Sequence, residues 1–368
     1  MKFTCDRAVL SEAVSISAHA VLPRSSNPVL EGLLLSLSGD LLQLTGYDTE
    51  TGIRCSISAV GEVEGQIVLP CSTFGDILRR LPDGEVEIEV QGERVRITCG
   101  AAEFNILAFP ADSYPDVVFP TSGFHVTVTQ KMLRSLINQT VFAVSQSDSK
   151  PVHTGCLFHI GGGAIEVVGV DGFRLALRKE PLEGAEEEAI FVVPGKTLQE
   201  ISRIVGDSDV AVTLYVSGRS VVFETENVSV VTRTLEGEFL NYQQAIPKEA
   251  LMNARVDVRL LQDCLDRASL LISEKQRSPV RIRFAPGLAH ISCSTPLGRV
   301  NDSMPIVLQG DEVEMGFNNR FLQDALKHCG ESELVLEMSS SVSPMVLRPV
   351  ESEAFTFLVL PVRLKSEG

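Results

Sequence analysis

The sequence predicts an α+β protein of three similar domains, each with two helices backed by antiparallel sheets. The first observation is a polar residue followed by an amphipathic run, which occurs three times: Asp6, Leu10 and Val14; Thr129, Leu133 and Ile137; Asp257, Leu261 and Leu265. The second is a strand-like run, a helix-like run and an alternating strand, which also occur three times, starting at IVLP, FVVP and VEMG. The spacing agrees, because Gly32 to Gly155 is 123 residues and Pro70 to Pro194 is 124.

This spacing indicates whole domains and not short stacked repeats, whose periods are about 20 to 50 residues. At about 150 residues per domain, a chain of 368 residues holds two or three domains, and the repeat selects three. We expect the domains at 1–121, 122–247 and 248–368. Clusters of Pro and Ser place the linkers at 110–123 and 247–254.

The elements follow the same order in each third. Amphipathic periodicity predicts the first helices at about 6–21, 129–144 and 258–272, and the second at 72–81, 196–205 and 319–329. Hairpins are expected to turn at Ser38-Gly39-Asp40 and Gly161-Gly162-Gly163. Alternation marks further strands at Val86, Ile88 and Val90, and at Val210, Val212 and Leu214. Helices should therefore cover one face of each sheet.

Composition narrows the class of protein. The first seven residues carry charges and no uninterrupted apolar run follows, which predicts neither a signal peptide nor a membrane span and places the protein in the cytoplasm. No two of the eight cysteines have CxxC spacing, so we expect buried thiols and neither zinc ligands nor disulfides.

The net charge of −16 is unevenly distributed. The six predicted helices together carry +4, which leaves −20 on the rest of the chain. If the helices share one face, that face is mildly basic, as a nucleic-acid partner requires. The alternative is that acidic strand ends and turns only keep the protein soluble.

No motif for catalysis stands out. The Gly161-Gly162-Gly163 triplet lacks a following Gly-Lys-Ser/Thr, so a hairpin turn is the better interpretation than a phosphate loop. The six histidines never fall at metal-binding helix spacing, and no GxSxG elbow occurs. Asp48 and Asp171 occupy equivalent repeat positions, which indicates structural turn carboxylates. We predict no enzyme activity, no metal and no cofactor.

Six segments, in order along the chain, carry a resemblance to a known family: MKFTCDRAVL, NPVLEGLLL, TGYDTE, VDGFRLAL, EMGFNNRFLQDAL and LVLPVRL. They resemble the bacterial DNA polymerase III beta subunit, the replication sliding clamp. The resemblance implies the DNA clamp fold and a head-to-tail homodimer that forms a closed ring around duplex DNA. It also implies partners that dock on the ring: the polymerase alpha subunit, the clamp loader and other proteins with a clamp-binding motif.

The resemblance and the helix charges together assign candidate sites. Candidate contacts to DNA are Arg7, Arg24, Arg79, Arg80, Lys131, Arg134, Lys150, Lys196 and Arg203. The resemblance implies a hydrophobic peptide-binding pocket made of His153, Gly172, Phe173, Arg174, Leu175, Leu240, Ala245, Asn318, Val342, Pro344, Leu358, Val359, Leu360, Pro361, Val362 and Arg363. We expect a partner peptide to contact Leu175, Val359, Pro361 and Val362. The implied dimer contacts are Phe104 and Ile106 against Leu270 and Leu271.

Two other hypotheses remain at this stage. An enzyme of repeated β-rich domains would need a cleft with perturbed titratable groups. A ring-shaped scaffold could bind peptides without encircling DNA, and helix charge alone does not distinguish it from a clamp.

Overall fold

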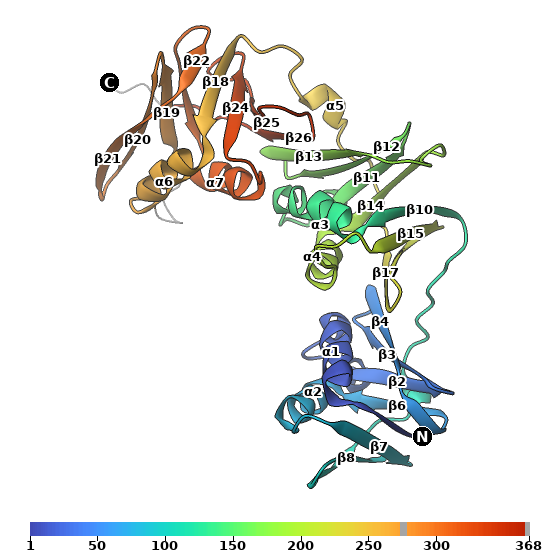
Figure 1. Cartoon of the computed structure of the whole chain (residues 1–368). Helices are drawn as coiled ribbons and strands as arrows, with labels where there is room; N and C mark the ends of the chain where they lie inside the picture. The colour runs from blue at the N-terminus through green and yellow to red at the C-terminus, as the bar shows by residue number, and fades with distance from the viewer. Residues whose placement is uncertain (273–277, 365–368) are drawn as a thin grey trace. The chain divides into compact units, whose positions relative to one another are not determined.

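The structure is a computed structural model that describes residues 1–272 and 278–364, and the chain forms two compact units. The first unit contains Met1–Leu133 and Glu200–Thr234, and the second contains Arg134–Gln199 and Leu235–Gly368. Each unit has one small and one large antiparallel sheet with helices beside them (Figure 1). The predicted α+β class is confirmed.

The first unit contains a five-stranded sheet and an eight-stranded sheet. The small sheet has the order β5-β1-β7-β8-β9, and the large sheet has the order β10-β15-β16-β17-β4-β3-β2-β6. Their strands are β1 Lys2–Asp6, β2 Gly32–Ser38, β3 Leu41–Tyr47, β4 Thr51–Ser58, β5 Val60–Val63, β6 Gly65–Pro70, β7 Glu85–Gln91, β8 Arg94–Cys99, β9 Ala102–Leu107, β10 Phe124–Thr129, β15 Ala211–Ser217, β16 Ser220–Glu224 and β17 Val228–Arg233. The large sheet thus joins strands from the first and second predicted domains.

The second unit repeats this plan with nine and four strands. The large sheet has the order β14-β11-β12-β13-β26-β25-β24-β18-β22, and the small sheet has the order β21-β20-β19-β23. Their strands are β11 Gly155–Gly161, β12 Ala164–Val170, β13 Arg174–Pro181, β14 Ala189–Pro194, β18 Met252–Asp257, β19 Val280–Ala285, β20 Leu288–Thr295, β21 Gly298–Pro305, β22 Val307–Gln309, β23 Val313–Phe317, β24 Glu333–Met338, β25 Met345–Pro349 and β26 Phe355–Val359.

All six predicted helices are present, and the three predicted starting residues cap three of them, α1, α3 and α6. The α-helices among the described residues are α1 Arg7–Ser17, α2 Cys71–Arg80, α3 Gln130–Asn138, α4 Gly195–Ile204, α5 Tyr242–Ala245, α6 Val258–Ser269 and α7 Asn319–His328. Asp6, Thr129 and Asp257 each accept a hydrogen bond from a backbone N–H in the first turn, at 2.8 Å from Ala8, 3.1 Å from Met132 and 2.8 Å from Leu260. Such caps satisfy amide groups that lack a partner inside the helix.

Some predicted boundaries are wrong. The first helices end earlier than their amphipathic patterns, because short 3-10 turns continue the pattern at Ala18–Ala20 and Val141–Ala143. Val210 precedes β15 and is 49% exposed, so it is not an inward strand residue. The predicted linker at 247–254 overlaps β18, which already begins at Met252.

Helices and sheets enclose an apolar core in each unit. In the first unit, Leu10 and Val14 of α1 and Phe74 of α2 pack with Phe3 and Ile88 of the small sheet. In the second unit, residues of α6 and α7 pack in the same way with strands of both sheets. Figure 1 shows α1 and α2 side by side in the first unit and α6 and α7 side by side in the second.

The predicted turns are confirmed. Gly39, Gly162 and Gly163 have φ of 55°, 58° and 77°, a conformation that residues with a side chain rarely adopt. Asp48 accepts hydrogen bonds from the N–H groups of Glu50 and Thr51, and Asp171 accepts them from the N–H groups of Phe173 and Arg174. Both carboxylates therefore hold a tight turn between strands, as expected from their repeat positions.

The cysteines are buried and free, as predicted. Burial raises the pKa of Cys5 and Cys156 to about 12 and that of Cys55 to about 11. These thiols therefore stay protonated at neutral pH, which suits core residues and not nucleophiles.

Candidate functional site

The implied peptide-binding residues lie in the second unit around paired strands β13 and β26. Leu175 pairs with Leu358, and Leu358 pairs with Val346 on β25. These three side chains belong to one apolar cluster that also contains Val152 and Tyr242. We use the name strand-end surface for the side of this cluster that contains Leu175 and Leu358, together with the neighbouring residues Phe173, Leu360, Pro361 and Val362.

The C-terminal residues after β26 complete this surface. Leu360 donates its N–H to the carbonyl of Phe173 at 2.8 Å, and Val362 donates to the carbonyl of Gly316 at 2.7 Å. Exposed fractions are 62% for Phe173, 36% for Leu360 and 42% for Val362, and Pro361 is half-buried. A row of apolar side chains is therefore accessible beside the buried Leu175 and Leu358.

The structure corrects the predicted role of Val359 as a contact for a partner peptide. Its side chain is 1% exposed and packs in the core with Met345 and Phe357. Because successive residues of a strand point to opposite faces, Leu358 faces the strand-end surface and Val359 faces away. Val359 cannot contact a peptide there without a rearrangement of the core.

Arg174 is fixed by charge and by aromatic rings. Its guanidinium lies 2.9 Å from Asp171 and 2.5 Å from Asp324 of α7, and its central carbon is 4.6 Å from the ring centroid of Phe321. Only 8% of the side chain is exposed. Since removing one partner from a buried ion pair leaves an uncompensated charge, Arg174 acts here as a structural anchor behind Phe173.

The segment before β18 forms the other border. Phe239 and Ile246 pack against the apolar cluster, and Leu240 is 41% exposed. Tyr242 donates to Glu166 at 2.6 Å. Burial raises the pKa of Tyr242, and the hydrogen bond to Glu166 raises it further. The phenol therefore stays neutral and holds α5, with Ala245, against the sheet.

The remaining residues predicted for the pocket lie at the rim of the strand-end surface or have a local structural role. His153 is half-buried with its ring centroid 5.4 Å from that of Phe239, and burial lowers its pKa, with Lys150 adding to the effect. Asn318 caps α7 by accepting from the N–H of Arg320 at 3.1 Å. Val342 is 72% exposed and Pro344 half-buried in the β24–β25 turn, while Gly172 and Arg363 are exposed.

Sequence reasoning missed Val346, Leu177, Phe239 and Tyr242, all members of the apolar cluster or packed against it. The apolar and aromatic residues of the EFLNY segment carried a weak signal. Strand pairing showed that Val346 meets Leu358, and tertiary packing placed the others in or against the same cluster.

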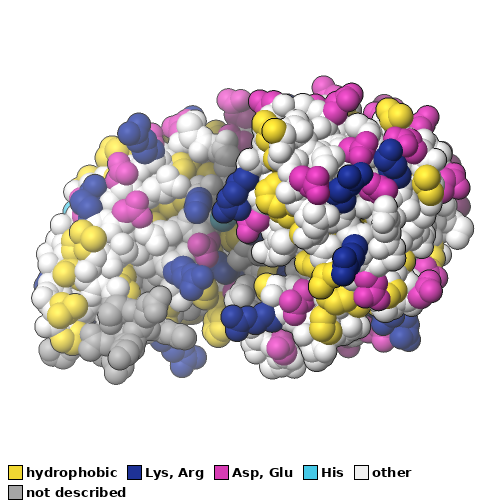
Figure 2. All heavy atoms as spheres, turned by 90° about the horizontal axis from the view of Figure 1, so that it is seen from below, with side chains coloured by type: hydrophobic (Ala, Val, Ile, Leu, Met, Phe, Trp, Pro, Cys, Tyr) yellow, Lys and Arg dark blue, Asp and Glu magenta, His cyan; other side chains and the backbone are white. Residues whose placement is uncertain are grey.

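The predicted DNA-contact residues lie mainly on exposed helix positions, and the structure pairs several of them with carboxylates. Arg79 and Arg80 end α2, are 64% and 74% exposed, and both approach Asp76. Arg203 lies 2.7 Å from Glu200, and Arg7 is only 21% exposed and is paired with Asp83. Arg24, Lys131, Arg134, Lys150 and Lys196 are exposed. On the face drawn in Figure 2, basic and acidic side chains are interspersed.

The residues predicted for the dimer lie on an edge strand in the first unit and at the C-terminal end of α6 in the second. Phe104 and Ile106 are on β9, which ends the order of the small sheet in the first unit. Phe104 is 38% exposed. In the second unit, Leu270 caps α6 and is 81% exposed, Leu271 is half-buried, and β21 ends the order of the small sheet.

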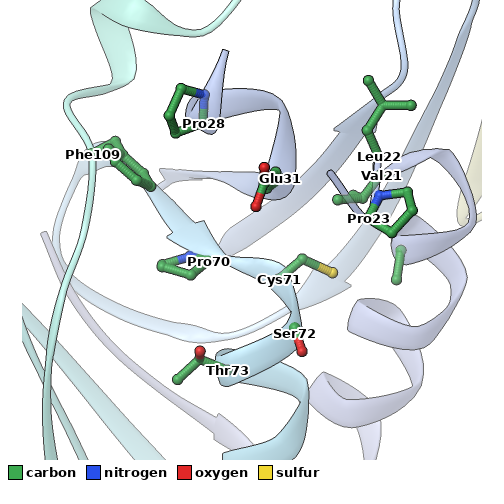
Figure 3. A pocket seen from close by; sticks show the side chains of 11 residues that line it. Val21, Leu22, Pro23, Pro28, Glu31, Pro70, Cys71, Ser72, Thr73 and Phe109 are labelled. Carbon is green, nitrogen blue, oxygen red and sulfur yellow. The ribbon is translucent and has the colours of Figure 1, made fainter. Parts of the chain in front are cut away.

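A separate hollow of about 330 Å³ lies in the first unit, between the segment after α1 and the start of α2. Figure 3 shows Pro28, Pro70 and Phe109 around it, with Glu31 at one wall. The Glu31 carboxylate accepts from the N–H of Ser25 at 2.8 Å, so it holds the loop that carries Arg24.

Within 1–272 and 278–364, no group of three or more His, Cys, Asp or Glu side chains is placed to hold a metal ion. In the same part of the chain, no helix has both the length and the apolar character needed to cross a membrane. The predicted site residues thus lie on an apolar strand-end surface, at exposed basic helix positions and at the edges of sheets. The fold is that of an α+β protein in which each of two units repeats the same plan of one small and one large antiparallel sheet.

Comparison with known proteins identifies the family. Three protein-family models match the chain in order. They describe the DNA polymerase III beta subunit: its N-terminal domain at residues 1–118, its central domain at 127–241 and its C-terminal domain at 243–363. The chain belongs to the DNA polymerase III beta subunit family.

Relatives agree over the whole length. The chain is 32% identical to the beta sliding clamp of Bacillus subtilis over 99% of this chain and 100% of the relative, and 31% identical to that of Halalkalibacterium halodurans over the same shares. Among solved structures, it matches the sliding clamp of Bacillus subtilis with a TM-score of 0.95 at 31% identity, and a putative DNA polymerase III beta subunit of Eubacterium rectale with 0.94 at 33%. Each covers 99% of this chain and 100% of the other.

Proposed function

We propose that this chain is a DNA sliding clamp, a non-catalytic processivity factor that encircles duplex DNA as a head-to-tail dimer in the cytoplasm. The observation that carries the proposal is the match of all three domain models in order over one chain. On this proposal the three domains are those expected at 1–121, 122–247 and 248–368.

The exposed basic helix residues suit a mobile contact with DNA. Affinity for duplex DNA grows with each phosphate that is neutralised, so a clamp that slides needs few net positive charges. Arg79 and Arg80 share Asp76, and Arg203 is close to Glu200. Exposed pairs of this kind contribute about 0 to 1 kcal/mol, so a phosphate can compete for the guanidinium without gaining a strong hold.

The strand-end surface is proposed as the docking site for the polymerase alpha subunit, the clamp loader and other proteins with a clamp-binding motif. Exposed Phe173, Leu360 and Val362 lie beside buried Leu175 and Leu358, which suits apolar anchor side chains of a short peptide. Since binding energy concentrates in a few well-packed anchors, one compact surface can serve several partners.

The ring requires two copies of the chain. We propose that edge strand β9 of one copy meets edge strand β21 of the next, with Phe104 and Ile106 against Leu270 and Leu271. Edge strands offer unpaired backbone groups that a second chain can satisfy, and Leu270 adds a largely exposed apolar side chain.

Topological retention tests this function. After loading, the protein should remain on closed circular DNA during gel filtration and leave the same DNA once it is linearised. Equal retention on both forms would indicate ordinary binding, and loss from both, with peptide binding intact, would favour a scaffold that never encircles DNA.

We expect that replacing Arg24, Arg79 and Arg80 with Ala weakens duplex binding at low salt, with no change in sequence preference. Log affinity falls as log salt concentration rises. With about three fewer phosphate contacts, this negative slope should be less steep by about 2.7. Fluorescence anisotropy over a salt series measures both quantities. Asp76→Asn should have the opposite effect, because it frees Arg79 and Arg80.

A matched control removes three exposed strand arginines, Arg94, Arg255 and Arg283. This variant has the same net charge as the helix variant. If both variants lose equal affinity, the contact is a general charge effect and the assigned helix residues are wrong.

A further inference from the structure

The large sheets of the two units have equivalent strand orders. The run β2-β3-β4-β17-β16-β15-β10 in the first unit corresponds to β11-β12-β13-β26-β25-β24-β18 in the second. In both units, the middle of this run is made by strands from two different predicted domains. The first unit therefore contains its own equivalent of the strand-end surface.

The strand register identifies the equivalent residues. In the second unit, Leu175 pairs with Leu358, which pairs with Val346. In the first unit, Gly52 pairs with Val231, which pairs with Val222. The row in the first unit therefore has apolar side chains at two of the three positions, Val231 and Val222. At the third position Gly52 stands in place of Leu175.

A segment of the chain itself covers this row. Tyr114 and Val117 are 7% and 9% exposed and belong to the same apolar cluster as Val222 and Val231. A Cβ added to Gly52 would lie 2.6 Å from Cγ1 of Val117. Val117 therefore fills the space that the Leu175 side chain fills in the second unit.

Polar contacts hold the segment in place. Arg54 donates to the carbonyl of Val117 at 3.3 Å, and its guanidinium carbon lies 4.1 Å from the ring centroid of Phe119. Tyr114 donates to the carbonyl of Thr45 at 3.2 Å. Val118, between two inward residues, is 66% exposed. Val117 therefore points into the apolar cluster, whereas Val118 points to solvent.

The border of the surface also differs between the units. Phe173 and Leu360, which are exposed and apolar, correspond in register to Glu50 and Arg233. The first unit therefore has a polar border around an apolar row that is already covered.

We propose that the segment Tyr114–Phe119 is a built-in peptide ligand for the first unit's equivalent of the strand-end surface, so that each chain offers one open peptide site instead of two. The proposal rests on the proposed function only in identifying the open surface as a partner site. The segment is tethered, and tethered ligands have effective concentrations in the millimolar range. A free peptide of the same sequence at micromolar concentration therefore competes poorly with the tethered segment.

The test adds the segment as a separate, labelled peptide to a variant in which the chain's own segment is released. Val117→Ser with Phe119→Ser should release the segment, and a fluorescein-labelled peptide of residues 113–120, SYPDVVFP, should then bind the full-length variant and not the wild type. Methyl NMR shifts of Val222 and Val231 should report its position. Val118→Ser, which changes the exposed neighbour, is the matched control and should behave as the wild type does.

Two results would overturn the proposal. One is a folded double variant that does not bind the peptide. The other is equal binding to the double variant, the control and the wild type, which would locate the peptide elsewhere on the protein.

A second variant displaces the segment without removing its anchors. Gly52→Leu restores the equivalent of Leu175 and should force Val117 out, because the added side chain meets Cγ1 of Val117 and Cγ1 of Val231. Hydrogen exchange over 114–119 should then be at least about tenfold faster, as for a locally released segment. Unchanged exchange in a folded Gly52→Leu protein would contradict the assignment.

This experiment separates the two proposals. Binding of SYPDVVFP to the double variant does not depend on any replication partner. If the wild type fails to bind a polymerase-derived peptide while the double variant binds SYPDVVFP, the proposed partner site is wrong and the built-in ligand stands.

Discussion

A chain that ends at Pro361 should lose binding of a polymerase-derived peptide while it remains dimeric. The truncation removes Val362, which is 42% exposed and is held to Gly316 by a backbone hydrogen bond of 2.7 Å. Loss of a well-placed anchor commonly costs about 2 kcal/mol or more, which is about thirtyfold in affinity. Calorimetric titration gives the affinity, and sedimentation of the same sample gives the oligomeric state.

A chain that ends at Leu364 is the control, because it keeps Val362 and the bridge to Gly316. It should bind the peptide as the full chain does. Wild-type affinity in the shorter chain would exclude the strand-end surface as the partner site and leave the exposed apolar side chains around Phe173 without a role.

The second large effect concerns the dimer. Replacing both Leu270 and Leu271 with Ala should produce mostly monomer at low micromolar concentration. Leu270 is 81% exposed in the single chain, and burying a leucine contributes about 1.5 to 3 kcal/mol. Two such losses should raise the dissociation constant by at least about a hundredfold. Analytical ultracentrifugation over a dilution series measures this shift.

The fold should survive this double substitution, since Ile272, and not Leu270 or Leu271, packs against the core. Leu41→Ala with Leu251→Ala removes two other exposed leucines, of 45% and 70% exposure, and should leave the dimer intact. A dimer that withstands the Leu270 and Leu271 changes would exclude these residues from the interface.

Local signals in the sequence were reliable where one residue determines a local geometry. Asp6, Thr129 and Asp257 cap helices because their side-chain oxygens reach amides of the first turn. Asp48 and Asp171 hold turns for the same reason. Helix ends were less well predicted, because a 3-10 turn such as Ala18–Ala20 continues the amphipathic pattern of the α-helix before it.

The candidate site was predictable only in part. The resemblance located Leu175 and Leu358, which lie together in the apolar cluster. Val359 was misassigned because β26 is buried on both faces, and a strand of this kind shows no alternation between apolar and polar residues. Which of its side chains face the strand-end surface depends on pairing with β13 and β25.

By itself, the sequence determined the α+β class, the repeat of about 123 residues, most helices and turns, and the family. These properties depend on local periodicity and on residues near one another in the chain. Only the tertiary structure decided that Gly52 faces Val117, that Arg174 is anchored by Asp324, and that the two large sheets share one register plan. Such contacts join segments far apart in sequence, and the packing of whole strands selects them, so no single stretch of residues encodes them.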